Sequence, residues 1–198
     1  MTIINIRGTS GAGKSHLVRR LMEKCGAQTP FLCPHPEKPG KSVVLGHHFL
    51  DANVVVMGRY ATPSGGCDNF SWKGAADWLQ EKISSIVSEW ELGGKPPHVV
   101  FEGVLVSQWK TERFVSLARC APLRVVLLST PLNDCLEAIN ARRWARGNEN
   151  HVGPATTMKK YNYAIQKAKT DRAAGLSVAE LSRGDAYMHC CELLGLGV

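Results

Sequence analysis

The sequence predicts an α/β fold in which a mainly parallel β-sheet is flanked by helices, built as one domain over residues 1–198. Short apolar, β-branched runs alternate with segments whose apolar residues recur every three or four positions, a pattern typical of strands alternating with helices. The chain is long enough to bury a sizeable core. It also contains no internal repeat, low-complexity segment or linker suited to a domain boundary.

The first elements are a buried strand over residues 2–6, a glycine-rich loop and a helix. The loop "GTSGAGKS" fits the pattern GxxxxGK[ST] at every fixed position, and Leu17, Val18 and Leu21 follow it at helical spacing. Strand, loop and helix together form the context that the P-loop motif requires, so we expect a P-loop NTPase rather than a glycine-rich turn without a ligand.

The loop has a direct phosphate-binding chemistry. Glycines let successive backbone N–H groups turn toward phosphate oxygens, and the helix adds its positive N-terminal end. Lys14 is expected to reach the β- and γ-phosphates of ATP, and the Ser15 hydroxyl to bind Mg²⁺. The predicted nucleotide-binding residues are Gly8, Thr9, Ser10, Gly11, Ala12, Gly13, Lys14 and Ser15.

The remaining elements follow in chain order. Residues 26–41, which hold four prolines and two glycines, are expected to be a loop. Apolar runs predict strands over 42–50, 53–57, 98–101 and 123–128. Helical spacing predicts helices over about 75–90, 110–119, 130–146, 158–173 and 184–194. Thr130 is the expected N-cap of the third of these helices, with Pro131 at its first position, and Ser182 with Asp185 resembles a capping box.

Glu102 is the first of three features that indicate a kinase. It ends a buried strand predicted to lie beside the P-loop, where a carboxylate is needed to support Mg²⁺. A solvated carboxylate at a strand end is the alternative. An NKxD base-reading motif of GTPases and an hhhhDE strand of motor ATPases are both absent from the sequence.

Three arginines at the end of one predicted helix are the second feature. Arg142, Arg143 and Arg146 lie in "INARRWARG", within a predicted lid over about residues 140–158. Guanidinium groups stabilise the charge that spreads over a migrating phosphoryl group. The alternative is a basic helix end that only offsets the helix dipole.

The third feature is the stretch "ATPSGGCDNFSWKG" over residues 61–74. Asp68 is its only acid and the candidate general base for an acceptor hydroxyl, with an N-cap for the following helix as the alternative. Arg59 is a candidate for binding a substrate phosphate. Tyr60 and Trp72 are candidates for stacking on a base, although packing beneath the loop would equally explain Trp72.

Composition limits the remaining classes. No apolar run approaches the length of a membrane helix, and residues 1–7 lack the basic segment and cleavage site of a signal peptide. Seven cysteines without a CxxC pair are typical of reduced thiols in a cytoplasm. A zinc site built from Cys33, His35, His47 and His48 is a minor alternative. The net charge of +7 favours a polyanionic partner.

The motifs together resemble a known family. The blocks "IINIRGTSGAGKS", "GRYATPSGGCD", "VFEGVLVS", "LLSTPLNDCLEAINARRWARG" and "LSRGDAY" are similar to the bacteriophage P-loop kinases related to thymidylate kinase, above all the 5-hydroxymethyluracil DNA kinases. The P-loop alone is unspecific, whereas the GGCD and FEG blocks at their spacing are more telling.

The resemblance implies a specific reaction. The γ-phosphate of ATP would move to the 5-hydroxymethyl oxygen of 5-hydroxymethyluracil in phage DNA, and other DNA-modification enzymes would then displace the phosphoester. It also implies that residues 8–15 bind ATP, that Glu102 supports Mg²⁺, that Arg142, Arg143 and Arg146 form the lid and that Asp68 faces the acceptor. The host cytoplasm is the expected location. Two alternatives remain open: a kinase of a free nucleoside, nucleotide or other small metabolite, and an NTP-driven switch without an acceptor.

Overall fold

The chain folds around one mixed sheet in a computed structural model that describes residues 1–61, 65–90 and 94–197. In these residues a seven-stranded sheet has the order β2-β3-β4-β5-β1-β6-β7. The strands are β1 (Ile3–Arg7), β2 (Thr29–Pro34), β3 (Ser42–Phe49), β4 (Val54–Met57), β5 (His98–Glu102), β6 (Leu123–Leu128) and β7 (Ser177–Leu181). Along this sheet order, every neighbouring pair from β4 to β7 is parallel, whereas the pairs β2–β3 and β3–β4 are antiparallel. The mainly parallel sheet with flanking helices confirms the predicted α/β class.

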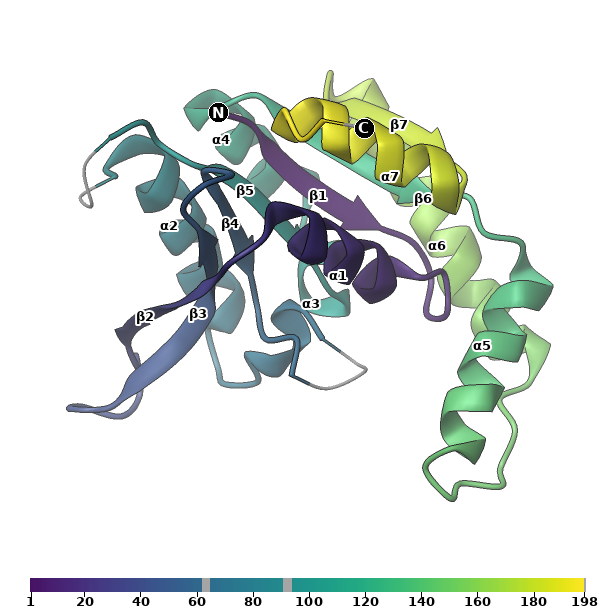
Figure 1. The fold of residues 1–198 in the computed structure, drawn as a ribbon. Coiled ribbons are helices and arrows are strands. Elements are labelled where there is room, and N and C mark those ends of the chain that lie inside the picture. The colour runs from purple at the N-terminus through teal and green to yellow at the C-terminus, as the bar shows by residue number, and fades with distance from the viewer. Residues whose placement is uncertain (62–64, 91–93, 198) are drawn as a thin grey trace.

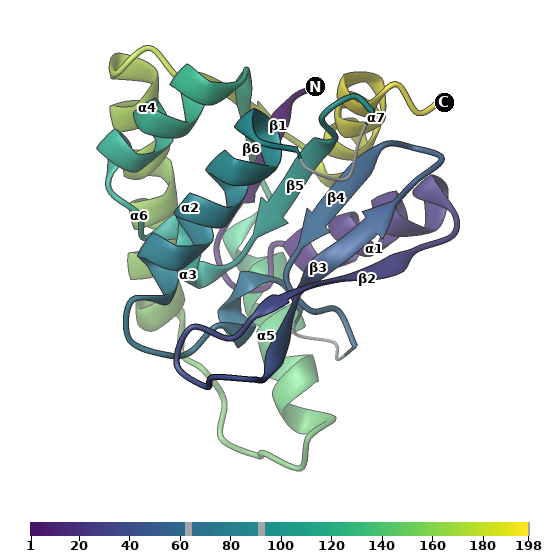
Figure 2. The same cartoon turned by 90° about the vertical axis from the view of Figure 1, so that its left-hand side faces the viewer.

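Helices cover both faces of the sheet (Figures 1 and 2). The helices are α1 (Lys14–Cys25), α2 (Ala75–Ser88), α3 (Val104–Ser107), α4 (Thr111–Cys120), α5 (Leu132–Trp144), α6 (Pro154–Ala173) and α7 (Arg183–Leu194), with a 3₁₀ turn, η1 (Cys67–Asn69). Buried residues of α1 and α7 share one hydrophobic core, and those of α2 and α4 share the other. Because β1 lies between β5 and β6, the loop after β1 meets the carboxyl ends of central strands, where ligands bind in open α/β sheets.

Two edge strands were not predicted. Residues 29–34 form β2, although residues 26–41 were expected to be a loop. Its prolines, Pro30 and Pro34, are tolerated because β2 is an edge strand, where a missing backbone donor can face solvent. The opposite edge strand, β7, is half exposed along most of its length, so its sequence "SVAEL" lacks a strong apolar signal.

The start of α5 also differs from its predicted form. Pro131 occupies the N-cap position, so the prediction that Thr130 caps the helix is wrong. The Thr130 hydroxyl instead donates a hydrogen bond to the Ala12 carbonyl of the P-loop, at 2.9 Å. By contrast, the Ser182 hydroxyl accepts a hydrogen bond from the Asp185 N–H, so Ser182 is confirmed as the N-cap of α7. Helix α6 begins at Pro154, four residues before its predicted start.

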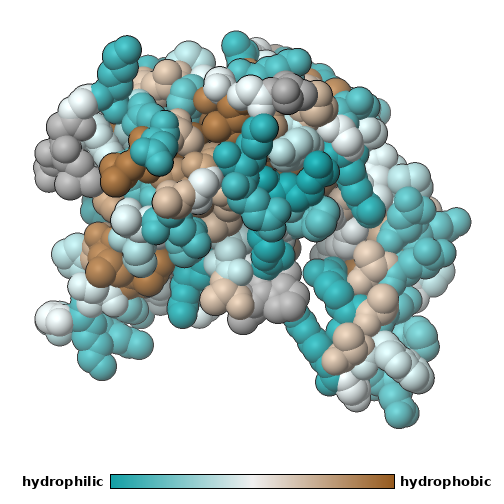
Figure 3. Space-filling model, viewed as in Figure 1, coloured by the Kyte–Doolittle hydropathy of each residue, from teal (hydrophilic) through white to brown (hydrophobic). Residues whose placement is uncertain are grey.

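An arm built from α5 and the following loop stands away from the body of the molecule (Figure 1). The space-filling view shows a hollow between this arm and the body, bordered mostly by hydrophilic residues (Figure 3). Over the described ranges, no helix has the length and apolarity needed to cross a membrane. The same residues contain no group of three His, Cys, Asp or Glu side chains placed to hold a metal ion.

Candidate active site

The P-loop is held in a turn that only glycine adopts easily. Gly11 and Gly13 have φ angles of 83° and 97°, in the left-handed region. A Cβ atom at Gly11 would lie 2.2 Å from the Cys135 carbonyl oxygen of α5, so a side chain there would separate the loop from this helix. The sequence therefore fixes both the shape of the loop and its contact with α5.

Lys14 lies at the centre of this loop. Its ammonium group donates hydrogen bonds to the carbonyls of Gly8, at 2.9 Å, and Thr9, at 3.1 Å. The side chain is buried, and burial lowers the pKa of the ammonium group, an effect that the Glu102 carboxylate opposes. A cation held inside a cradle of backbone N–H groups is suited to polyphosphate.

Glu102 and Ser15 meet beside the loop. Strand β5 pairs with β1 in a register that places Glu102 opposite Ile6, and the Ser15 hydroxyl donates a hydrogen bond to Glu102 Oε1 at 2.8 Å. The carboxyl is 1% exposed, and burial raises its pKa to about 7 against the opposing effect of Lys14. A hydroxyl oxygen and a carboxylate oxygen within hydrogen-bond distance are the hard donors that Mg²⁺ prefers.

One glycine of residues 61–74, Gly66, supports this carboxylate; residues 62–64 lie outside the described part. A Cβ atom at Gly66, whose φ is 96°, would lie 2.5 Å from Glu102 Oε1. The Gly66 N–H and carbonyl both bond to the backbone of Arg59 across an isolated antiparallel bridge. The backbone at Gly66 therefore packs directly against Glu102 and restricts where this carboxyl can lie.

Asp68 follows this bridge in η1. Its Oδ1 accepts a hydrogen bond from the Leu105 N–H at 2.9 Å, so the side chain caps the short helix α3, which follows Glu102 by one residue. The alternative of a cap for α2 is wrong, because the N-cap of that helix is Gly74. Asp68 is exposed and lines the same cavity as Lys14 and Glu102, so its capping bond leaves the carboxylate facing that cavity.

A cavity of about 350 Å³ brings these groups together. It is lined by P-loop residues, Asp68 and Glu102, and by three arginines from different elements: Arg19, Arg142 and Arg183. Sequence reasoning did not select Arg183, whose guanidinium donates to the carbonyls of Ala12, at 3.1 Å, and Gly11, at 3.4 Å. The only sequence signal for it was its place in the "LSRGDAY" block. The signal for Arg19 was its position one helical turn after Ser15.

The three predicted lid arginines lie in different surroundings. Arg142 lines the cavity. Arg143 donates hydrogen bonds to the Asn150 carbonyl, at 2.7 Å, and the Asn148 side chain, at 3.0 Å, and so shapes the loop between α5 and α6. Arg146 is exposed in that loop and is not among the residues that line the cavity.

The structure does not bring the predicted base-stacking residues to this cavity. Arg59 and Tyr60 line a separate groove of about 590 Å³ beside α1 and β3. The Trp72 ring contacts the rings of His35, Phe70 and Trp78, with centroids 5.0 to 5.5 Å apart. Trp72 therefore belongs to an aromatic cluster under the hairpin of β2 and β3.

Comparison with known proteins adds one full-length relative. The chain is 34% identical over 194 residues to a protein of Pseudomonas phage PaMx11 named "5-hmdU DNA kinase", covering 97% of this chain and 96% of the relative. No protein-family model matches the chain. Among solved structures it resembles a deoxyadenosine kinase from M. mycoides with dCMP and dCDP bound, with a TM-score of 0.44, 14% identity and 98% of each chain covered.

Proposed function

The chain belongs to the family of phage 5-hmdU DNA kinases, and from this membership we propose that it phosphorylates the 5-hydroxymethyl group of 5-hydroxymethyluracil in DNA with ATP. The full-length relative carries this proposal. The site supports it, because Lys14 and Ser15 of the P-loop, a carboxylate beside that serine and a second carboxylate line one cavity. A DNA substrate implies that the protein works in the cytoplasm of a bacterial host.

The residues of the cavity divide into a donor part and an acceptor part. The P-loop amides, Lys14, Arg142 and Arg183 hold the polyphosphate of ATP and stabilise its developing charge. The hydroxymethyl oxygen forms a bond to the γ-phosphorus while the bond from that phosphorus to the bridging oxygen breaks, and ADP leaves. Asp68 accepts the hydroxyl proton. Arg143 and Arg146 position the lid loop around the donor.

Ser15 and Glu102 are the residues that would hold Mg²⁺. Their oxygen atoms lie within 2.8 Å of one another and suit a hard divalent cation. When bound, the cation neutralises charge on the phosphates.

The affinity for the magnesium–nucleotide complex should depend on pH around 7. Because burial raises the pKa of Glu102 to about 7, the carboxyl is protonated below this pH and becomes an anionic ligand above it. The metal-dependent part of ADP binding should therefore weaken about tenfold between pH 8 and pH 6. Calorimetry of ADP binding with and without Mg²⁺ at pH 6, 7 and 8 measures it.

The nucleotide also titrates in this range, so a variant must serve as reference. Glu102→Gln removes the protein carboxyl and should show only the pH dependence that belongs to the nucleotide. If the wild-type protein and Glu102→Gln respond to pH in the same way, Glu102 is not the metal-supporting group.

An acceptor panel tests the proposed function. The protein is incubated with γ-labelled ATP and Mg²⁺, and with DNA containing 5-hydroxymethyluracil, matched thymine DNA, or the free 5-hydroxymethyl nucleoside and nucleotide. Label is expected only in 5-hydroxymethyluracil DNA. Label in the free compounds alone would make the protein a small-metabolite kinase, and hydrolysis without any labelled acceptor would make it an NTP-driven switch.

DNA binding should be strongly salt-dependent. The net charge is +7, and the basic run from Arg142 to Arg172 includes exposed lysines on α6. Each phosphate contact should add about −0.9 to the log–log slope of affinity against salt on duplex, or about −0.7 on a single strand. Fluorescence anisotropy with labelled oligonucleotides measures the slope. Affinity that does not change with salt would favour the small-metabolite kinase.

A further inference from the structure

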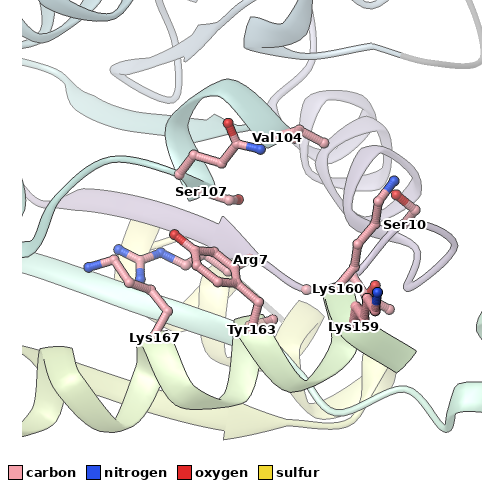
Figure 4. A pocket seen from close by; sticks show the side chains of 12 residues that line it. Arg7, Ser10, Val104, Ser107, Lys159, Lys160, Tyr163 and Lys167 are labelled. Carbon is pink, nitrogen blue, oxygen red and sulfur yellow. The ribbon is translucent and has the colours of Figure 1, made fainter. Parts of the chain in front are cut away.

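A second cavity adjoins the 350 Å³ cavity that holds Lys14 and Glu102, here called the phosphate cavity, on the other side of the P-loop. It has a volume of about 460 Å³ and lies between α3 and α6 (Figure 4). Ser10 of the P-loop and Val104 of α3 line both this cavity and the phosphate cavity. A ligand bound here would therefore contact the same two residues as a ligand in the phosphate cavity. The volume is within the usual range for a small-ligand site.

The floor of this cavity contains two buried donors without partners. Arg7 is 3% exposed and bonds to Asn5 and Asp171, but its Nη2 atom has no hydrogen-bond partner within the described part of the chain. Thr9 is 5% exposed, and its hydroxyl likewise has none. Both atoms are shielded from the cavity, and the Arg7 guanidinium packs over the Phe114 ring with its Cζ 4.0 Å from the ring centroid, so Arg7 and Thr9 form a fixed polar floor beneath the cavity.

The walls combine apolar faces with positive charge. Tyr163 of α6 and Val104 of α3 are 50% and 44% exposed, and both side chains lie at the cavity between their helices (Figure 4). Lys159 and Lys160 are exposed on α6 at the same cavity, and no carboxylate is among the described residues that line it. Gln108 adds an amide that can both donate and accept. These groups suit a planar base with a polar edge that is attached to phosphates.

We propose that this cavity, here called the acceptor cavity, receives the 5-hydroxymethyluracil nucleotide after it has left the base stack; this rests on the function proposed above. The ring would lie against Tyr163 and Val104, and a uracil carbonyl oxygen would accept from the Gln108 amide. The flanking DNA phosphates would contact Lys159 and Lys160. The 5-hydroxymethyl arm would point past Val104 toward Asp68 and the γ-phosphate.

The groove that holds Arg59 and Tyr60 suits this ligand less well. Among the residues that the structure describes, only Arg19 lines both that groove and the phosphate cavity, and a carboxylate, Glu23, lines the groove. Both linings are basic, since Arg19 and Arg59 line the groove and lysines line the acceptor cavity. The acceptor cavity differs in that it shares Ser10 of the P-loop with the phosphate cavity and has no carboxylate among its described lining residues. The aromatic residue that contacts the acceptor base is therefore Tyr163 in this proposal, in place of Tyr60 or Trp72.

Kinetics of α6 variants test the proposal. Tyr163→Ala should raise KM for a 5-hydroxymethyluracil oligonucleotide about tenfold or more, because base–aromatic stacking is lost. KM for ATP and Tm should stay unchanged, and Tyr163→Phe, which keeps the ring, should restore wild-type KM. Replacing both Lys159 and Lys160 by Ala should reduce the salt slope of DNA binding by about 0.7 per lost contact on a single strand. Lys169→Ala is the control, since Lys169 is exposed on α6 but does not line the cavity.

A photocrosslink locates the base directly. An oligonucleotide with 5-iodouracil at the acceptor position is irradiated with the protein, and the linked peptide is identified by mass spectrometry. A link to Tyr163, lost in Tyr163→Ala, is expected. A link to Tyr60 or Trp72, or an unchanged DNA KM in Tyr163→Ala, would overturn the acceptor cavity while wild-type transfer to 5-hydroxymethyluracil DNA still upheld the proposed function. Absence of that transfer in the wild-type protein would overturn both.

Discussion

Replacing Lys14 by Ala should reduce phosphoryl transfer by at least about 10²- to 10³-fold, the cost typical of removing one group that stabilises transition-state charge. The ammonium is held inside the P-loop by the carbonyls of Gly8 and Thr9, next to the Ser15–Glu102 pair. A phosphoryl group passing between ADP and an acceptor needs a cation at this position. Burial opposes the charge on Lys14, so the residue is better explained by phosphate binding than by stability.

The fold should survive this substitution. Lys14→Ala should therefore keep Tm unchanged or raised, and Lys14→Met, which fills more of the same space without the charge, should lose transfer to the same extent. Lys24→Ala is the matched control, because Lys24 lies exposed in the last turn of the same helix. Transfer is measured under single-turnover conditions with labelled ATP. Turnover near the wild-type rate in Lys14→Ala would show that the P-loop is not the donor site.

The central strands could be predicted because their sequences contain all the information needed. Strands β1, β5 and β6 are buried on both faces, so each is a continuous apolar run, and the turn after β1 has a motif with fixed glycines. The edge strands could not be predicted in this way. Strands β2 and β7 each pair with one neighbour only and bury few side chains against the core, so their sequences tolerate prolines and polar residues.

The residues of the candidate site likewise include some that could be predicted from local sequence and some that could not. Lys14, Ser15 and Glu102 follow from a local motif and from the position of a strand end. The roles of Arg183 and Arg7 do not follow from the sequence, because tertiary packing decides what each side chain contacts. Arg183 of α7 donates to the P-loop carbonyl of Ala12, and Arg7 lines the second cavity. The sequence analysis did not select Arg7, whose partner Asp171 lies 164 residues further along the chain. A hydrogen bond over that separation has no signature in a single sequence.

Asp68 shows how one residue can have both of the roles that a sequence suggests. Its Oδ1 accepts from the Leu105 N–H, which fixes α3 immediately after Glu102, and the carboxylate faces the phosphate cavity. A cap requires only an acceptor oxygen, whereas a general base requires a group that takes up a proton. Asn supplies the first and lacks the second, so Asp68→Asn separates the two roles.

Asp68→Asn should reduce kcat for 5-hydroxymethyluracil DNA by about 10²- to 10⁴-fold, the usual contribution of a general base. The lower end of this range is expected, because phosphoryl-transfer transition states are loose and need little early proton removal. The Asn amide oxygen can still cap α3, so Tm and nucleotide affinity by calorimetry should match the wild-type protein.

Two further variants distinguish the alternatives. Asp68→Ala removes the cap as well and should lower Tm in addition to kcat, by the loss of about 1 kcal/mol that a missing cap typically costs. Asp51→Asn, in the exposed turn between β3 and β4, should change neither. If Asp68→Asn transfers phosphate at the wild-type rate while Asp68→Ala is impaired only in stability, Asp68 is a helix cap alone. The acceptor proton must then leave by another route, and Glu102, the other carboxylate that lines the cavity, becomes the group to test.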